Sequence, residues 1–255
     1  MSSAAASAEP QRVLVAVPSL SWQLSLQLAS FLLELGAGRL VDPKRWSFEI
    51  ALLPEVQPVH YARNMLVGAM LEGEHEWLWF LDDDMTPSPS TVAVLGVEGD
   101  VITGRAPIVR PGEDGEPIVV HAAFDRREGE TFGYAPMSDG PSPIVAAGAG
   151  CLLIRRTVLE DERMRLGGAY VSAFGDPRDL RDEPGAAPAV FRMPTKPNGE
   201  PLIGEDMDFV YRAHLLGYRC MFQPRALLGH QKRVDLSGVE RMLAKARRSQ
   251  ERRDA

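Results

Sequence analysis

Residues 77–86 read "WLWFLDDDMT", an apolar run that ends in three consecutive aspartates. A short apolar run without alternation is typical of a strand buried on both faces of a sheet. Similar runs occur at residues 12–20 ("RVLVAVPSL"), 46–54 ("WSFEIALLP") and 100–104 ("DVITG"). Segments with apolar residues at helical spacing separate them, at residues 21–38, 59–73 and 88–96, the last with Ser88 or Ser90 as its cap. This alternation predicts an α/β fold with a mostly parallel central sheet flanked by helices.

The pattern changes after residue 104. Residues 116–124 and 130–136 are expected to pair as a small antiparallel hairpin, and residues 144–160 combine a Gly-rich bend, a strand and the start of a helix. Residues 173–201 are dense in Pro, Gly and charged residues. Because long loops in compact domains are often functional, we expect this segment to act as a lid. A helix starting near Glu205 and a strand ending near His230 complete the predicted domain.

Length and composition favour one domain over residues 11–232 of the 255-residue chain, preceded by a disordered leader at 1–10 and followed by a basic helical tail at 233–255. No apolar stretch approaches the roughly 20 residues of a membrane span, and the start lacks the features of a secretory signal. Cys151 and Cys220 are expected to be reduced and buried, which suggests a cytoplasmic setting. Whether the protein is a homo-oligomer stays open.

The charge is unevenly distributed. The chain carries −7 in all, whereas residues 232–255 contain eight Lys or Arg and four Asp or Glu, which leaves the body strongly acidic. Such a tail could contact a polymer, an anionic lipid surface or a second subunit, or could simply be a solvated helix. The composition of the body shows no basic groove for nucleic acid.

The aspartate triplet follows the third predicted strand, at the edge of the sheet where open α/β folds bind ligands. In an extended chain residues two apart project to the same side, so Asp82 and Asp84 would aim at one point while Asp83 turns away. Two carboxylates together with phosphate oxygens suit an octahedral Mg²⁺ or Mn²⁺. A solvated turn or a helix cap remains the alternative for these residues.

A second acidic group, Glu205, Asp206 and Asp208, opens the helix near residue 205. The helix dipole alone could account for acids at this position. We expect Asp208 to pair with Arg212 one turn later, which would leave Glu205 and Asp206 for a site. After the next strand, His230 is a candidate third metal ligand.

Four motifs occur in order: "FLDDDM" (80–85), "GAGCLLIRR" (148–156), "GEDMDFVYRAHLLGYR" (204–219) and "GH" (229–230), with "ARNMLV" (62–67) before the first. Together they resemble the signatures of nucleotide-sugar glycosyltransferases of the GT-A fold, in particular the family-2-like group, over residues 12–232. The resemblance implies a single Rossmann-like GT-A domain. It also implies a metal-dependent hexosyltransferase that moves a sugar from a UDP- or GDP-sugar to an acceptor hydroxyl, with Mn²⁺ or Mg²⁺ as cofactor. The acceptor could be a glycan, a lipid, a protein or a nucleic acid.

The resemblance also assigns roles to individual residues. It implies a metal site of Asp82, Asp84 and His230, with Asp206 as the catalytic base of an inverting reaction and Glu205 orienting the donor or acceptor. It implies nucleotide contacts from Pro18, Ser19, Arg63, Asn64, Asp82 and Asp83. It implies contacts with the donor or acceptor sugar from Gly148, Ala149, Gly150 and Phe174, although close packing at a bend would also explain these glycines.

Two other interpretations stay open. "FLDDDMT" also fits the nucleophile motif of haloacid-dehalogenase-like phosphatases, in which Asp82 would attack phosphorus and Asp84 would act as acid and base. That enzyme would further need Thr103 and Lys196 at the site, with Asp206 and Asp208 holding Mg²⁺. Its nucleophile strand normally lies at the amino end of the domain, whereas two strand–helix units precede it here. The remaining alternative is a module that binds nucleotide sugars without catalysis.

Overall fold

The computed structural model describes residues 9–20, 23–111, 117–126, 132–165, 170–171, 177–178 and 187–231. Most of the predicted leader, the predicted tail and Phe174 lie outside these described residues. The helices are α1 (Leu26–Gly36), α2 (Val59–Glu72), the 3₁₀ helix η1 (Pro89–Gly96), α3 (Arg156–Glu160) and α4 (Glu205–Leu215). Among the described helices, none is long and apolar enough to cross a membrane.

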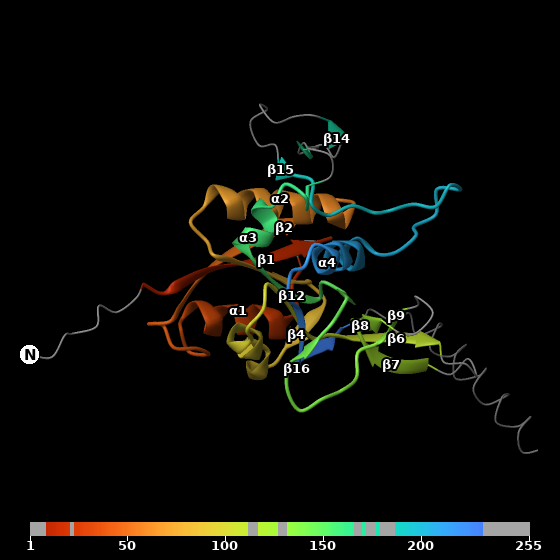
Figure 1. Ribbon diagram of the computed structural model, residues 1–255. Coiled ribbons are helices and arrows are strands. Elements are labelled where there is room, and N and C mark those ends of the chain that lie inside the picture. Colours follow the sequence, from red (N-terminus) through yellow and green to blue (C-terminus); the bar gives the residue numbers. More distant parts are fainter. Residues whose placement is uncertain are drawn as a thin grey trace, which may run out of the picture.

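The central sheet has the strand order β10-β16-β5-β12-β3-β1-β2. Figure 1 shows its strands β1 and β2 between α2 above and α1 below. Its strands are β1 (Gln11–Ser19), β2 (Trp46–Pro54), β3 (Trp77–Leu81), β5 (Val101–Arg105), β10 (Ser142–Pro143), β12 (Cys151–Arg155) and β16 (Cys220–His230), and β4 (Met85–Pro87) pairs with β16. β1 pairs in parallel with β2 and β3, and β5 pairs in parallel with β16. β12 lies between β3 and β5 and is antiparallel to both. The predicted α/β fold with a mostly parallel sheet is confirmed.

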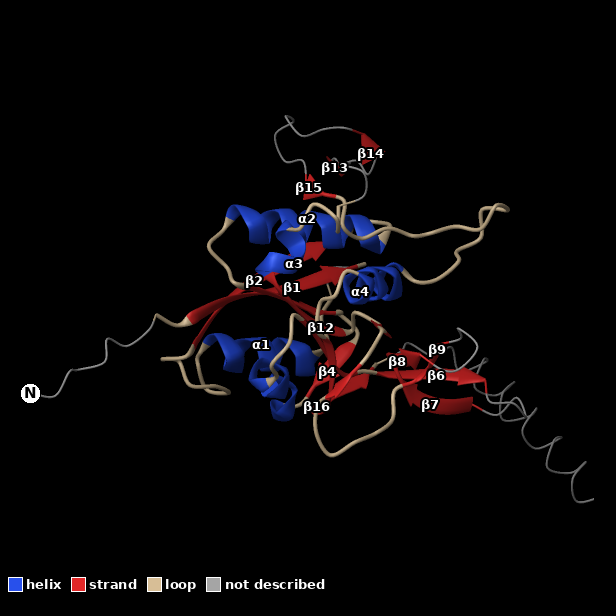
Figure 2. Ribbon diagram, viewed as in Figure 1, coloured by secondary structure: helices blue, strands red, loops and turns tan. Residues whose placement is uncertain are grey.

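Helices cover both faces of this sheet, with α2, α3 and α4 on one side and α1 on the other (Figure 2). The alternation along β1 explains how both faces become buried. Leu14 and Ala16 belong to the core beneath α2 and α4, whereas Val13 and Val15 belong to the core against α1. A strand buried on both faces needs apolar residues at nearly every position, which is why the strands read as continuous apolar runs.

Two helix predictions differ from the structure. The helix predicted from residue 21 begins at Leu26, because Ser25 is its N-cap and accepts a hydrogen bond from Leu28 N at 3.0 Å. The segment predicted as a helix at 88–96 is a 3₁₀ helix. Its turn closes through Thr91 N, which donates to Ser88 O at 2.9 Å.

The antiparallel part contains two hairpins where one was predicted. β6 (Pro107–Pro111) pairs with β7 (Pro117–His121), and β8 (Ala123–Arg126) pairs with β9 (Phe132–Tyr134). The expected pairing of the 116–124 and 130–136 segments is therefore correct only for the part of the first segment after Ala122. β8 also pairs with β11 (Ala146–Ala147), so that β11-β8-β9 is a three-stranded sheet. Three short strands, β13 (Tyr170–Val171), β14 (Pro177–Arg178) and β15 (Ala187–Pro188), form a further sheet in the order β14-β13-β15.

Both cysteines are buried free thiols, as predicted. Burial raises the pKa of the Cys151 thiol to about 12, and burial likewise raises the pKa of Cys220 to about 12. Since the thiolate is the reactive form, these side chains act as small apolar groups of the core.

The described end of the predicted lid is fastened to the core. Asn64 on α2 donates to Phe191 O at 2.9 Å and accepts hydrogen bonds from Val190 N at 3.0 Å and Phe191 N at 2.8 Å. The Phe191 ring packs between Phe80 and Phe209, at centroid distances of 5.6 and 4.4 Å. The expectation that Asn64 contacts the nucleotide is therefore wrong, because its fully buried amide holds the chain at residues 190–191.

This role gives a stability prediction. Asn64→Ala leaves buried backbone groups without partners, and we expect the free energy of unfolding in urea to fall by about 2–4 kcal/mol. Asn198→Ala is the matched control, because the Asn198 amide accepts one hydrogen bond from Glu200 N at an exposed turn, and we expect a change below about 1 kcal/mol. Equal stability of the two variants would contradict the anchoring role.

Candidate functional site

The three aspartates lie on a turn and point to three different partners. Residues 82–84 are not extended, because Met85 N donates to Asp82 O at 3.0 Å and closes the turn. Asp83 accepts a hydrogen bond from Ser19 Oγ at 2.6 Å. The expectation that Asp82 and Asp84 converge by strand alternation is therefore wrong. Among the described residues, no three His, Cys, Asp or Glu side chains form a ready-made cation site.

Asp82 is held by a buried arginine. Arg63, on α2, donates from Nη2 to Asp82 Oδ1 at 3.0 Å and from Nε to Glu205 Oε1 at 3.3 Å, and its guanidinium lies 5.4 Å from the Phe80 ring centroid. Burial alone would lower the pKa of Arg63, but the charges of Asp82, Glu205 and Asp206 outweigh it and leave that pKa raised. Arg63 thus ties the aspartate turn to the start of α4, and its buried Nη1 has no hydrogen-bond partner among the described residues.

Asp206 is a carboxylate held by backbone amides. Its Oδ2 accepts from Ala149 N at 3.0 Å and its Oδ1 accepts from Met207 N at 2.8 Å. Burial, and secondarily the charge of Glu205, raise the pKa of Asp206, while Arg63 and the two amides oppose this rise. A fixed carboxylate with a raised pKa is a stronger proton acceptor than an ordinary carboxylate.

The raised pKa predicts how stability depends on pH. The folded state favours the protonated Asp206, so its stabilising contribution is present below the ordinary pKa of 3.8 and is lost as pH rises through the folded value. We expect the free energy of unfolding of the wild type, relative to Asp206→Asn, to fall as pH rises from about 4 towards the folded pKa, with a slope of at most about 1.4 kcal/mol per pH. Urea titrations measure this difference, and the exposed Asp139→Asn serves as the control. A difference that is flat or rises with pH would contradict the raised pKa.

Asp84 faces His230 at the end of β16. His230 Nδ1 lies 2.9 Å from Pro107 O and Nε2 lies 2.7 Å from Asp84 Oδ2. Since a carbonyl oxygen only accepts, Nδ1 carries a hydrogen. The contact between Nε2 and Asp84 Oδ2 is a hydrogen bond, and a metal cation bound by both atoms would replace its proton. A histidine whose second nitrogen donates to a backbone carbonyl is the usual arrangement of a metal ligand, so this pair fits a divalent cation.

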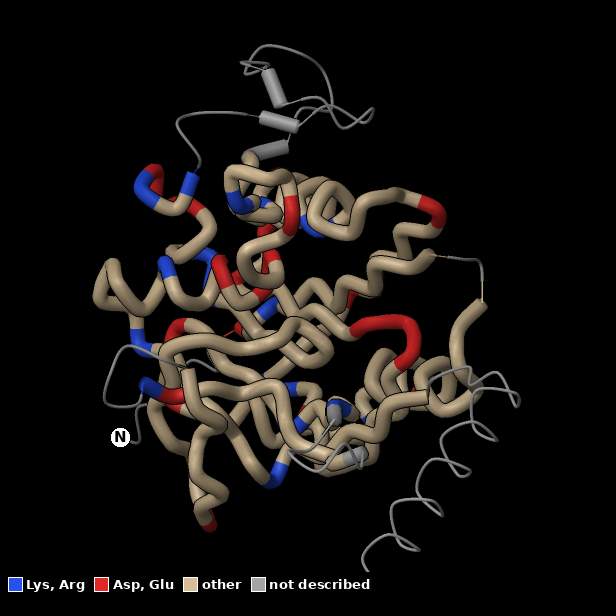
Figure 3. The backbone as a smooth tube through the Cα atoms, turned by 90° about the vertical axis from the view of Figure 1, so that its right-hand side faces the viewer, with Lys and Arg blue, Asp and Glu red and all other residues tan. Residues whose placement is uncertain are grey.

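Two neighbouring cavities meet at these residues. The first, of about 320 Å³, is lined by Pro18, Ser19, Leu20, Val56, Val59, Arg63, Asp82, Asp83, Asp84, Glu205 and Asp206. The second, of about 200 Å³, is lined by Asp82, Met85, Ala106, Pro107, Ile108, Ala122, Phe124, Gly148, Ala149, Gly150, Asp206, Met207 and His230. Asp82 and Asp206 belong to both. Figure 3 looks towards the carboxyl ends of the parallel strands, and acidic segments lie near the middle of that view.

Most of the residues that line the two cavities are candidates that the sequence analysis had named. Pro18 and Ser19 border the first cavity, and residues 148–150 border the second. At Gly148 a Cβ would come within 2.9 Å of Ala122 Cβ, so close packing already requires a glycine there. The Pro107 carbonyl was missed, because a backbone acceptor leaves no trace in the sequence. Val56 in a loop, Val59 at the start of α2 and Ile108 on β6 were missed because a single apolar residue at such a position gives no sign of a cavity.

The groups that a phosphatase would need lie elsewhere. Lys196 pairs with Glu200 at 3.2 Å on an exposed turn, and Thr103 donates to Cys151 O at 3.0 Å within the core. Asp208 is bound by Arg212 at 2.8 Å, as predicted, and by Arg192 at 3.2 Å. These three side chains are absent from the linings of both cavities, so the structure contradicts the haloacid-dehalogenase-like alternative.

Comparisons with known proteins give matches in structure. No family model matches the chain, and no curated protein matches it in sequence. The chain is similar to A197 from STIV, with 17% identity and a TM-score of 0.47 over 88% of this chain and 96% of that one. It is similar to GalNAc-T7, solved with UDP, GalNAc and Mn²⁺, with 13% identity and a TM-score of 0.45, covering 88% of this chain but only 44% of that one.

A third similar structure is a glycosyltransferase involved in glycosylation of the major capsid of PBCV-1, with 13% identity and a TM-score of 0.43 over 90% of this chain and 98% of that one. All three TM-scores lie below 0.5. The sheet topology itself shows the α/β fold that the sequence predicted.

Proposed function

We propose that this protein is a metal-dependent, inverting glycosyltransferase that moves a sugar from a UDP- or GDP-sugar to an acceptor hydroxyl. The observation that carries the proposal is the pair of cavities joined at Asp82 and Asp206. Five carboxylates and one arginine are among the residues that line the first cavity, whereas the second is lined mainly by small and apolar residues. A donor with a diphosphate and a sugar would extend from the first cavity into the second.

The acidic cavity suits a nucleoside diphosphate only together with a cation. Asp84 and His230 would hold Mn²⁺ or Mg²⁺, with Asp82 next to it, while Pro18, Ser19 and Asp83 would border the nucleoside. A cation bound there would neutralise the charge that develops on the leaving diphosphate. The unpartnered Nη1 of Arg63 is a further donor for a ribose or phosphate oxygen.

The transfer itself depends on Asp206. The acceptor oxygen attacks the anomeric carbon from the face opposite the diphosphate, a new C–O bond forms, and the bond to the diphosphate oxygen breaks. The hydroxyl proton passes to the Asp206 carboxylate, which the amides of Ala149 and Met207 hold in position. Glu205, fixed by Arg63, would orient the sugar, and the backbone at Gly148 and Gly150 would border it.

Asp206 also favours an enzyme over a module that only binds nucleotide sugars. Its burial raises its pKa at a cost in stability, and a binding site has no need of a raised pKa. Asp206 lines the cavity that would contain the sugar as well as the cavity that would contain the nucleotide.

A panel of UDP- and GDP-sugars tests the proposal. Release of nucleoside diphosphate is followed with Mn²⁺ and with EDTA, with p-nitrophenyl phosphate and Mg²⁺ as the phosphatase arm. We expect turnover of at least one sugar nucleotide that EDTA abolishes, and none of the phosphate ester. Thermal stabilisation by UDP and Mn²⁺ without turnover of any donor would support the binding module instead.

A further inference from the structure

The β11-β8-β9 sheet borders the second cavity through Phe124. β11 leads directly into Gly148 and Ala149, and Ala149 N holds Asp206. β8 carries Phe124, which lines the cavity, and its register partner on β9 is Tyr134, with ring centroids 5.2 Å apart. This small sheet therefore carries a pair of aromatic side chains beside the cavity and leads into the residue whose amide fixes the proposed base.

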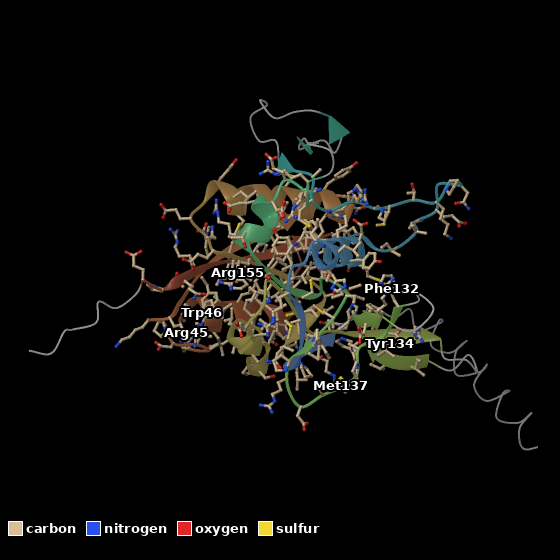
Figure 4. The ribbon with its side chains drawn as sticks, viewed as in Figure 1. Arg45, Trp46, Phe132, Tyr134, Met137 and Arg155 are labelled. Atoms are coloured by element: carbon tan, nitrogen blue, oxygen red, sulfur yellow. The ribbon has the colours of Figure 1, made fainter. Side chains whose placement is uncertain are left out.

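The Tyr134 ring is fixed by its neighbours. His121 packs against it edge-on at 5.9 Å and is itself stacked on Phe222 of the central sheet at 4.8 Å. The adjacent Phe132 packs against Tyr211 of α4 at 5.3 Å, which fastens β9 to the helix that begins with Glu205 and Asp206. Figure 4 shows Phe132, Tyr134 and Met137 near one another on this side of the molecule.

Arg110 lies over this ring. Its guanidinium carbon is 4.6 Å from the Tyr134 centroid, and the side chain is exposed. It lies two residues from Ile108 on β6, so the two side chains project to the same face of the strand, and Ile108 lines the cavity. In the part of the chain that the structure describes, Arg110 has no carboxylate partner, whereas Arg63 binds Asp82 and Glu205 and Arg212 binds Asp208.

We propose that Arg110, held on Tyr134, binds an oxyanion of the acceptor, a phosphate or a carboxylate near the hydroxyl that receives the sugar. This inference rests on the proposed function for its acceptor. A guanidinium stacked on an aromatic ring is already oriented and keeps its donors for a bidentate oxyanion. The acidic first cavity would repel such an acceptor, whereas Arg110, on the same face of β6 as the cavity-lining Ile108, would attract its anionic end.

Binding of small probes to the full chain tests the inference without turnover. Isothermal titration is carried out with glucose 6-phosphate, glucuronate and methyl glucoside, on the wild type, Arg110→Gln, Tyr134→Leu and Arg219→Gln. Arg219 is the matched control, because it is an exposed arginine at the opposite edge of the sheet, paired with Glu98 at 3.3 Å.

We expect an anionic probe to bind the wild type and the Arg219 variant equally, and Arg110→Gln to weaken it about tenfold, or about 1.4 kcal/mol. Tyr134→Leu should weaken it less, and methyl glucoside should not respond to Arg110. The anion that binds more tightly identifies phosphate or carboxylate as the group. Equal binding to wild type and Arg110→Gln, or no binding of either anion, would overturn the inference. Arg110-dependent binding in a protein that turns over no sugar nucleotide would overturn the proposed function and leave the anion site.

Discussion

Asp206→Asn is expected to lower kcat for sugar transfer by about 10²- to 10⁴-fold while changing the affinity for nucleoside diphosphate by less than about twofold. The amide keeps the shape of the carboxylate and can still accept a hydrogen bond from Ala149 N or Met207 N, but it cannot take a proton. Steady-state kinetics measure kcat, and calorimetry with UDP or GDP and Mn²⁺ measures affinity.

The exposed Asp139→Asn makes the same chemical change away from both cavities and should leave both values unaltered. If Asp206→Asn transferred sugar at the wild-type rate, Asp206 would not be the base. If nucleotide affinity fell together with kcat, the residue would belong to the donor contacts instead.

Asp84→Ala is expected to remove the metal-dependent part of nucleotide binding. Residues that merely orient a metal ligand contribute about 10–100-fold to affinity, so loss of a ligand should raise the Kd with Mn²⁺ by more than about 100-fold, to the value measured in EDTA. Asp84 Oδ2 lies 2.7 Å from His230 Nε2, so that both groups can bind the same cation. Without Asp84, the imidazole of His230 is the one ligand of this pair that remains.

Thermal unfolding without metal separates this effect from damage to the fold. Asp84 is partly exposed, and its backbone carbonyl, which accepts from Gln231 N at 2.7 Å, remains in the variant. We therefore expect a small change in Tm without Mn²⁺ and loss of the additional stabilisation by Mn²⁺ with UDP. Equal nucleotide affinity of Asp84→Ala and wild type would exclude Asp84 as a ligand.

Local patterns predicted the strands and the side of the sheet that carries the site. Continuous apolar runs at residues 12–20 and 77–81 indicated strands whose two faces are covered by helices. The run at 46–54 forms the edge strand β2, where Ile50 and Leu52 are exposed. The direction of β12 could not be read in this way. β5 ends at the edge of the sheet where the parallel strands have their carboxyl ends, and the hairpins that follow β5 lie at this edge. The chain re-enters the sheet from the same edge, so β12 runs antiparallel to β5.

Residue types predicted the composition of the site better than its geometry. Asp84 and His230 are together although they are far apart in sequence, and Arg63 and Asp82 share a cavity as expected. The sequence did not predict that the three aspartates point in different directions, because their directions depend on one turn, closed by a hydrogen bond to Asp82 O. Asn64 was misassigned because a polar side chain beside Arg63 on a helix gives no sign of which face it occupies.

The most direct test of the account is pulsed electron paramagnetic resonance of Mn²⁺ bound with UDP or GDP. We predict hyperfine coupling to one imidazole nitrogen, from His230, and to the phosphorus of the nucleotide in the same complex. His230→Gln should abolish the nitrogen coupling. A Mn²⁺–nucleotide complex with no nitrogen coupling in the wild type, or nucleotide binding that EDTA leaves unchanged, would contradict the assignment of the cation to Asp84 and His230.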